Sequence, residues 1–350
     1  MKQTVSIKNS AGLNMAGVVY APDGDHHGEW PAHAIILNTA IDPRNSNRSL
    51  KRDLVQRFNR IGIPVLIFDF PGVGDSEGEL RENLRMEIYQ QIEKGCFAGE
   101  TIAAVRFMHE RFPAPRTIIY GNCGGAVTAL HAAAQDRSIT HLLLMSLPVA
   151  LSIVEGGHPF DEHMAKVHFR DYLNRLRNPR NWRKIISSET NYSRIWAVIT
   201  RCIASLLGYS RKAEDIVDGL NVCFLSSFLA VKSRGTRVLC IFGENDHDPI
   251  LKYTKLFHQR YSPPGGEPAE HWKTVYVPDS FHHCFTPESR AHLWAHITRF
   301  LGQSADPAVH PEIAAAARPS PDAESSAPLI LSVPEASSEI SCARTISSLL

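Results

Sequence analysis

Short apolar runs alternate with amphipathic segments along most of the chain. Continuous apolar runs, which are typical of strands buried on both faces, occupy residues 33–38, 63–70, 117–120, 141–148, 236–248 and 273–279. Segments in which apolar residues recur with helical spacing occupy residues 47–62, 99–112, 124–136 and 288–301. Residues 2–20 alternate apolar and polar positions and predict a hairpin of edge strands. Strands that alternate with helices predict an α/β fold with a mainly parallel central sheet and helices on both faces.

Two segments interrupt this alternation and divide the chain. Residues 149–235 separate two predicted strands by far more than the usual connection of about 2–6 residues. They contain helical patterns, and we predict that they form a cap over the active-site end of the sheet. Residues 303–350 are predicted to be disordered because 26 of these 48 residues are Ala, Ser or Pro, which leaves few large side chains to bury. The predicted core therefore consists of residues 1–148 and 236–302.

Composition narrows the classes of function. The 350 residues are 43% hydrophobic and 21% charged, which is ordinary for a soluble globular protein. The formal net charge of +1 produces no field that would attract nucleic acid, and no uncharged apolar stretch of about 18 residues predicts a membrane span. The N-terminus lacks the apolar core of a signal peptide. The seven cysteines include no CxxC pair, which predicts reduced thiols in a cytoplasmic protein, and neither a disulfide framework nor a metal or cofactor site.

The segment TIIYGNCGGAVTALHAAA (117–134) joins a predicted strand to a predicted helix through a sharp turn, with Cys123 at the corner. Such a turn holds the corner residue in a strained conformation with its side chain exposed, which is the position of a nucleophile. Gly121 and Gly125 flank the corner, where larger side chains would collide with the strand and helix. The backbone N–H of Gly124, at the positive end of the helix, is placed to stabilise an oxyanion. A small buried cysteine without a catalytic role is the alternative interpretation.

A cysteine nucleophile needs a base, and the base needs an acid that orients it. Asp246 follows a predicted strand, and His282 and His283 follow the last one. Ligands of parallel α/β sheets bind at the carboxyl ends of the strands, so these side chains are expected near Cys123. Asp248 is the alternative to Asp246 as the acid. Chain order alone leaves both His282 and His283 as candidate bases.

The order nucleophile, acid, histidine resembles that of the α/β-hydrolase superfamily, and the likeness extends over residues 1–302. FDFPGVGDSEGE (68–79) resembles the Asp-x-x-Gly-x-Gly-x-Ser turn of the serine-aminopeptidase-like group. FHHCF (281–285) resembles the catalytic-histidine loop of these hydrolases, in which an aromatic residue follows two places after the histidine, and this implies His283 as the base. Residues 171–195 are similar to the cap of the exosortase-associated hydrolase type 1 family, whose corner nucleophile is also cysteine.

The resemblance also implies a second oxyanion donor in the loop after residues 33–38. Many hydrolases carry His-Gly there, whereas this chain has Asn38-Thr39-Ala40-Ile41. Because a backbone donor needs no particular side chain, the N–H of Thr39 or of Ala40 is expected to serve.

A cysteine at the corner also affects the expected reaction. A thiol has an ordinary pKa of about 8.5, and a helix N-terminus and a charged histidine lower it, so we expect Cys123 to be partly a thiolate. The acyl-enzyme would be a thioester. Cysteine in this turn is similar to dienelactone hydrolases and to polyhydroxyalkanoate synthases, which carry out hydrolysis and acyl transfer respectively.

We therefore predict a hydrolase that acts on a small-molecule acyl ester or thioester through a Cys-His-Asp triad and an acyl-cysteine intermediate. An acyltransferase that passes the acyl group to an alcohol or amine, and a non-catalytic binding protein, are the alternatives. Residues 163–212 contain eleven Lys or Arg and two Asp or Glu. This excess is either a solvated helical face or a basic rim that attracts an anionic substrate or an acidic acyl carrier protein.

Overall fold

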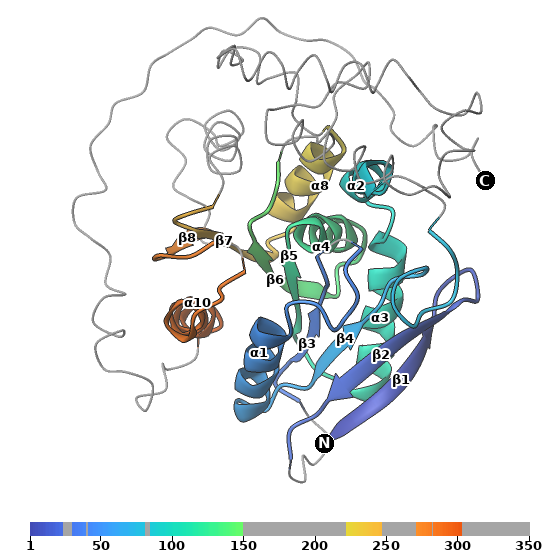
Figure 1. Ribbon diagram of the computed structural model, residues 1–350, viewed down its shortest axis with the longest axis horizontal. Helices are drawn as coiled ribbons and strands as arrows, with labels where there is room; N and C mark the ends of the chain where they lie inside the picture. The colour runs from blue at the N-terminus through green and yellow to red at the C-terminus, as the bar shows by residue number, and fades with distance from the viewer. Residues whose placement is uncertain are drawn as a thin grey trace, which may run out of the picture.

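The computed structural model describes residues 1–23, 30–39, 41–80, 85–149, 222–246, 271–281 and 283–302. The centre of this described part is an eight-stranded sheet with the strand order β1-β2-β4-β3-β5-β6-β7-β8 (Figure 1). The strands are β1 (Lys2–Lys8), β2 (Asn14–Tyr20), β3 (His33–Ile36), β4 (Val65–Phe68), β5 (Thr117–Asn122), β6 (Ile139–Met145), β7 (Arg237–Gly243) and β8 (Trp272–Val277). β1 and β2 form the predicted antiparallel hairpin, β2 pairs antiparallel with β4, and every pair from β4 to β8 is parallel.

Helices cover both faces of the sheet. They are α1 (Arg48–Arg60), α2 (Arg85–Glu93), α3 (Ala98–Arg111), α4 (Gly124–Gln135), α8 (Val222–Ser233) and α10 (Pro287–Phe300). α1 and α10 lie together on one face, while α2, α3, α4 and α8 cover the other (Figure 1). The mainly parallel sheet with helices on both faces that the sequence predicts is therefore confirmed.

The central strands supply apolar side chains to both layers. Ala34 and Ile36 of β3 belong to the core on the side of α1 and α10, whereas Ile35 belongs to the core on the opposite side. In β5, Ile118 and Ile119 divide in the same way. Because successive side chains of a strand point to opposite faces, a strand covered on both sides must be apolar at every position, which is why these runs show no alternation.

Helix α1 shows how the apolar pattern determines an element. Leu50, Leu54 and Phe58 follow one another at four-residue intervals and are all buried. The ring of Phe58 meets Trp294 of α10 edge to face, with ring centroids 5.2 Å apart, and this contact joins the two helices of that layer. The helix ends before Gly62, which has φ +76°, a left-handed conformation that glycine adopts with little strain.

Two helices, α2 and α8, were not predicted from the sequence pattern. Helix α8 occupies the end of the segment expected to form a cap, and it packs against α4, where the hydroxyl of Ser227 lies 2.7 Å from Nδ1 of His131. Its sequence VCFLSSFLAVKS is apolar around most of its circumference, so it lacks the one-sided pattern by which an exposed helix is recognised. Residues 150–221, with the predicted cap helices, and the tail 303–350 lie outside the described residues.

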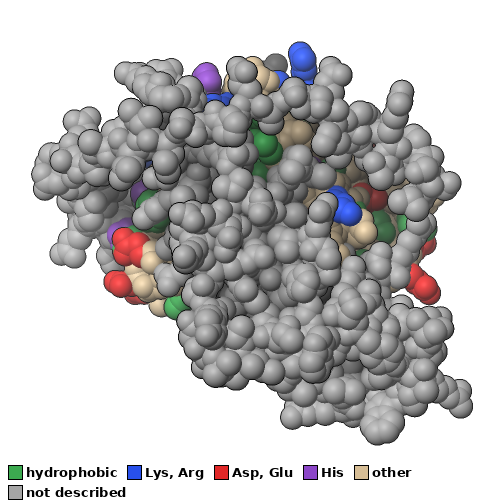
Figure 2. All heavy atoms as spheres, turned by 90° about the horizontal axis from the view of Figure 1, so that it is seen from above, with side chains coloured by type: hydrophobic (Ala, Val, Ile, Leu, Met, Phe, Trp, Pro, Cys, Tyr) green, Lys and Arg blue, Asp and Glu red, His purple; other side chains and the backbone are tan. Residues whose placement is uncertain are grey.

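Charges of both signs occur on the face shown in Figure 2. The coloured Lys and Arg side chains and the coloured Asp and Glu side chains appear there as separate spots rather than as one patch of a single sign. No helix among the described residues is long and apolar enough to cross a membrane.

Candidate active site

The candidate catalytic residues follow three of the parallel strands at one edge of the sheet. Cys123 comes directly after β5, Asp246 follows β7, and His283 follows β8. The pairs at the ends of these strands are Asn122 with Met145, Met145 with Ile241, and Gly243 with Val277. Since the strands are parallel and in register there, their carboxyl ends and the loops that follow gather at the same edge.

Cys123 stands at a sharp corner between strand and helix. Its backbone has φ 52° and ψ −115°, its N–H donates to the carbonyl of Met145 at 2.9 Å, and α4 begins at the next residue. A positive φ is uncommon for any residue other than glycine, and such conformations persist where the surroundings hold them. The turn therefore presents a half-buried thiol at the end of the sheet.

The flanking glycines are required by close backbone contacts. A Cβ atom at Gly121 would lie 2.4 Å from the carbonyl oxygen of Gly125. A Cβ atom at Gly125 would lie 2.4 Å from the carbonyl oxygen of Asn38. Any larger residue at either position would push α4 away from β5 or from the loop after β3, so both glycines determine where the thiol sits.

Burial raises the pKa of the Cys123 thiol to about 11, which overturns the expectation of a partly formed thiolate. A hydrogen bond from the Gly124 N–H to the sulfur acts in the opposite direction, as the helix N-terminus was expected to do, but it is the smaller effect. The negative charges of Asp246, Glu93 and Asp42 raise the pKa further. Desolvation penalises a sulfur anion more than one N–H donor stabilises it, so the resting cysteine carries its proton at neutral pH.

Asp246 is buried, and one of its carboxylate oxygens has two donors. The hydroxyl of Ser146 donates to Oδ2 at 2.5 Å, and the N–H of Gly243 donates to the same atom at 2.9 Å. Ser146 follows β6 at the same edge, has φ 47°, and donates its own N–H to Ile241 at 2.7 Å. Ser146 was not predicted as a site residue from the sequence. Its place near the end of an apolar run was the one feature that could have indicated it. Asp248, the alternative acid, lies outside the described residues.

The loop that carries His283 lies against the turn that carries Asp246. The N–H of Asn245 donates to the carbonyl of Ser280 at 2.9 Å, and a Cβ atom at Gly243 would lie 2.1 Å from that same oxygen. The loop therefore rests directly on the end of β7, with no room for a side chain between them.

The histidine loop has an irregular backbone. Asp279 and Cys284 have φ 46° and 42°, and Cys284 is buried, with the hydroxyl of Ser280 donating to its sulfur at 3.4 Å. His283 is half-buried between them, and its ring lies 5.1 Å from the ring of the exposed Phe285, centroid to centroid. His282 lies outside the described residues.

The loop after β3 was expected to supply the second oxyanion donor. The carbonyl oxygen of Asn38 points at Gly125, because the added Cβ there would lie 2.4 Å from the oxygen and 3.3 Å from the carbonyl carbon. In a trans peptide the next N–H points the opposite way, so the N–H of Thr39 is directed away from Gly125. Ala40, the other expected donor, lies outside the described residues.

No group of three or more His, Cys, Asp or Glu side chains arranged to hold a metal ion is present in the described part of the chain. The candidate residues themselves offer a thiol, an imidazole, a carboxylate and backbone donors at one edge of the sheet.

Several solved structures resemble the chain along most of its length. An esterase from Pyrococcus furiosus shares 13% identity, covering 86% of this chain and 90% of its own, with a TM-score of 0.53. The α/β hydrolase GrgF from a Penicillium species shares 15% identity, with coverage of 86% and 97% and a TM-score of 0.50. The hypothetical protein PA2218 from Pseudomonas aeruginosa shares 16% identity, with coverage of 87% and 94% and a TM-score of 0.54.

These similarities show that the chain has the α/β-hydrolase fold, as the sequence analysis expected. The sequence itself matches no protein-family model and no curated protein.

Proposed function

We propose that the protein is a hydrolase that cleaves an ester or thioester bond of a small acyl substrate through a Cys123-His283-Asp246 triad. The observation that carries this proposal is the backbone of Cys123, which has φ 52° at the junction of β5 and α4 and a hydrogen bond from the Gly124 N–H to its sulfur. A strained corner that aims a thiol and an N–H donor at the ligand-binding edge of the sheet is the geometry of a nucleophile with its oxyanion donor.

The raised pKa of Cys123 assigns a definite task to His283 in this mechanism. Because the resting thiol is protonated, the imidazole takes the proton while the sulfur attacks the carbonyl carbon. The carbonyl oxygen becomes an oxyanion, stabilised by the N–H of Gly124 and by a second backbone N–H of the loop after β3. The N–H of Thr39 points away from Gly125, which leaves that of Ala40 as the favoured second donor. When the tetrahedral species collapses, the bond to the leaving alcohol or thiol breaks, and His283 returns the proton to that group.

Hydrolysis then repeats the same steps with water. His283 takes a proton from a water molecule as its oxygen attacks the acyl-cysteine, and the thiol leaves with that proton. Asp246 orients the imidazole throughout, and the hydroxyl of Ser146 and the N–H of Gly243 hold its carboxylate in place. Ser146 thus joins the proposed site as a positioning residue.

Acyl transfer to an alcohol or amine is the second candidate, and the desolvation of the Cys123 sulfur favours it. Desolvation is the largest cause of the raised thiol pKa, although the residue as a whole is half-buried, and a bound substrate that excluded the remaining water would give another acceptor the advantage over hydrolysis. An acidic acyl carrier protein docked on the basic segment 163–212 would be a suitable donor, and that segment lies outside the described residues.

Membership in the serine-aminopeptidase-like group, and within it in the exosortase-associated hydrolase type 1 family, is also part of the proposal. It is supported by the motif at residues 68–79 and by the histidine loop. A cytoplasmic location is supported by the described cysteines, all of which are free thiols: Cys96, Cys123, Cys240 and Cys284.

The experiment is intact-protein mass spectrometry of the full-length chain after incubation with p-nitrophenyl esters of different chain length and with a panel of acyl-CoA thioesters. We expect an acyl adduct and turnover in the wild type, neither in Cys123→Ala, and both in Cys96→Ala, which removes an exposed thiol. Equal turnover in the wild type and in Cys123→Ala would reject the catalytic role. The absence of turnover and adduct in both would support the non-catalytic alternative.

The acceptor is identified in the same assay. If hydrolysis is the reaction, an added primary amine or alcohol leaves the lifetime of the adduct unchanged. If transfer is the reaction, the adduct disappears faster and the acylated amine or alcohol accumulates.

A further inference from the structure

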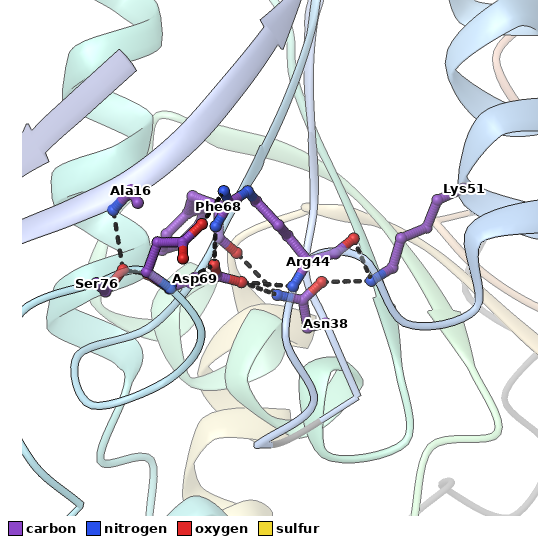
Figure 3. Close-up of polar contacts among 8 residues, drawn as sticks. Ala16, Asn38, Arg44, Lys51, Phe68, Asp69 and Ser76 are labelled. Atoms are coloured by element: carbon purple, nitrogen blue, oxygen red, sulfur yellow. Dashed lines mark hydrogen bonds and ion pairs between the residues drawn. The ribbon is translucent and has the colours of Figure 1, made fainter. Parts of the chain in front are cut away.

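The loop between β3 and α1 is tied to the sheet by four side chains, those of Asn38, Arg44, Lys51 and Asp69, which we call the loop clamp (Figure 3). This is the loop from which the second oxyanion donor is expected. The clamp joins it to α1 on one side and to the turn after β4 on the other (Figure 3). In the described part of the chain, no contact joins a side chain of the clamp to the Cys123 thiol. The clamp instead holds the backbone of Asn38, which lies against Gly125 next to the Cys123 corner.

Lys51 is the centre of the loop clamp and is buried despite its charge. It extends from the first turn of α1, and its Nζ donates to Oδ1 of Asn38 at 2.5 Å, to the carbonyl of Arg44 at 3.2 Å and to the hydroxyl of Ser46 at 3.3 Å. Burial lowers the pKa of Lys51 to about 8, against the charges of Asp42 and Asp69, which raise it. Burying a charged lysine that is only 7% exposed destabilises the fold unless its hydrogen bonds compensate. The three hydrogen bonds of Nζ provide this compensation, and all three reach residues of the loop after β3.

Asn38 connects Lys51 to the corner that carries Cys123. Its side-chain N–H donates to the carbonyl of Phe68 at 2.8 Å, while its Oδ1 accepts from Lys51. Its backbone carbonyl lies so close to Gly125 that no Cβ fits between them. The side chain of Asn38 is thus held by β4 and α1, while its backbone lies against the first turn of α4.

Arg44 and Asp69 hold the far side of the same loop. The backbone N–H of Arg44 donates to Oδ1 of Asp69 at 2.5 Å, and its guanidinium pairs with Asp69 and Asp75. Asp69 is fully buried, and a Cβ atom at Gly74 would lie 2.3 Å from its Oδ2, so the turn after β4 closes tightly around the carboxylate. The loop is therefore fixed at Asn38 and at Arg44.

We propose that Lys51 is a positioning residue that holds Asn38 against Gly125, so that the Cys123 corner keeps its thiol and the N–H of Gly124 aimed at the reacting carbonyl. The proposal rests on the proposed function. It assigns Lys51 an effect on the transition state, because an oxyanion donor stabilises catalysis only when it is aimed at the place where charge develops. A purely structural lysine would affect folding stability alone.

The test compares Lys51→Met, which keeps a long side chain but removes the three donors, with the wild type in full-length protein and with p-nitrophenyl butyrate as substrate. We expect kcat to fall about 10- to 100-fold while KM changes less than about 2-fold, because a misplaced donor is lost in the transition state rather than in substrate binding. Arg57→Met is the matched control, since it removes a cation that pairs with Asp53 on the same helix, and it should leave kcat unchanged.

A second measurement separates positioning from general damage. A trifluoromethyl ketone that carries the butyryl chain adds to the thiol and forms a tetrahedral oxyanion, so Lys51→Met should weaken its binding by the same factor as kcat/KM. A lowered melting temperature with wild-type kcat and wild-type ketone affinity would overturn the proposal.

If Lys51→Met does not fold, Asn38→Ala is measured instead. It removes the acceptor at 2.5 Å and leaves Lys51 its other two partners. The same selective fall in kcat is expected, and an unchanged kcat would overturn the proposal. Cys123→Ala is assayed in parallel: if it retains turnover, the proposed function fails, whereas loss in Cys123→Ala with full activity in the clamp variant rejects the clamp alone.

Discussion

The two edges of the parallel sheet both bury polar side chains, but in the described part of the chain they differ in where residues other than glycine have a positive φ. At the amino-terminal edge, where β3 and β5 begin, His33 is fully buried and lies 3.0 Å from the carbonyl of Phe112 through Nδ1 and 3.0 Å from the hydroxyl of Thr117 through Nε2. The same hydroxyl lies 3.0 Å from Nε2 of His109. These groups satisfy one another, as buried polar groups in stable cores do, although the β5–β6 pairing shifts register between Thr117 and Ile118.

The carboxyl-terminal edge has the strained backbone. Positive φ at residues other than glycine occurs, in the described part of the chain, at Asn47, Cys123, Ser146, Asp279 and Cys284. Each of these residues follows the carboxyl end of a parallel strand. Strain of this kind costs about 1–3 kcal/mol per residue and is retained where it has a use. Buried polar groups alone therefore do not distinguish the proposed site from the opposite edge of the sheet, whereas buried polar groups together with positive φ do.

The largest expected effect comes from relieving the strain at the corner. Cys123→Gly should abolish ester turnover, by about 10³-fold or more, and raise the free energy of unfolding by about 1 kcal/mol, because glycine adopts φ 52° without strain. Turnover of p-nitrophenyl butyrate and urea unfolding measure the two effects. Cys123→Ala should lose the same activity without the gain in stability. A clear fall in stability in Cys123→Gly would show that the corner is not strained.

The next largest effect concerns the protonation of the thiol. With a pKa raised to about 11 by burial, Cys123 should react with iodoacetamide at pH 8 about 50-fold more slowly than glutathione, and the rate should climb toward pH 11. Mass spectrometry of the peptide that contains Cys123 measures the rate. A fast rate that is independent of pH above pH 6 would restore the thiolate expected from the sequence.

A smaller effect separates the two ends of one strand. Ser146→Ala, at the carboxyl end of β6, should lower kcat/KM about 10-fold, because Asp246 loses the donor at 2.5 Å that orients it. Thr140→Ala removes a hydroxyl from the amino-terminal end of the same strand, where it donates to the carbonyl of Thr117, and should lower only stability. Steady-state kinetics and thermal melting distinguish the two, and equal loss of kcat/KM in both variants would remove the distinction between the edges.

The smallest effect on catalysis is expected at His33. His33→Leu should lower the free energy of unfolding by about 1–3 kcal/mol, since the carbonyl of Phe112 and the hydroxyl of Thr117 lose a buried partner, while kcat/KM stays within about 2-fold. Urea unfolding and steady-state kinetics measure this outcome. A loss of activity without a loss of stability would place His33 in the site instead.

The free energy of unfolding of His33→Leu can also be measured as a function of pH. Burial lowers the pKa of His33 to about 4, from 6.5 in the unfolded chain, so the unfolded state binds more protons between those values. The stability present above pH 6.5 is therefore lost as the pH falls toward 4. His33→Leu should show a shallower decline in this window, and His141, whose pKa burial also lowers to about 4, accounts for part of the slope that remains.

Much of the candidate site could be proposed from the sequence because its signals are local. Gly121 and Gly125 flank Cys123 within five residues, and the close contacts of both glycines follow from the junction of one strand with one helix. Asp246 and His283 each follow an apolar run, and the parallel order of the sheet brings the ends of such runs to one edge. These inferences needed only chain order and the period of the hydrophobic pattern.

Two residues of the proposed site could not be recognised from the sequence. Ser146 has a partner that is distant in sequence, and Lys51 is buried although lysine is ordinarily exposed. The hydroxyl of Ser146 meets a carboxylate 100 positions later, and nothing around either residue indicates this pairing. A lysine in the first turn of a helix is ordinarily exposed, and only the packing of α1 against the loop after β3 buries Lys51.

Local sequence was enough to predict the strands of the sheet, most of the helices around it, the corner with its glycines, and the kind of side chain at each strand end, because these depend on neighbours within a few residues. The protonation of Cys123, the support of Asp246 and the burial of Lys51 depend on the packing of distant segments. From local sequence, the helix N-terminus was expected to lower the pKa of the Cys123 thiol. In the folded protein, desolvation outweighs that effect and raises the pKa to about 11. Desolvation depends on everything that surrounds an atom, and that surrounding exists only once distant segments have packed together.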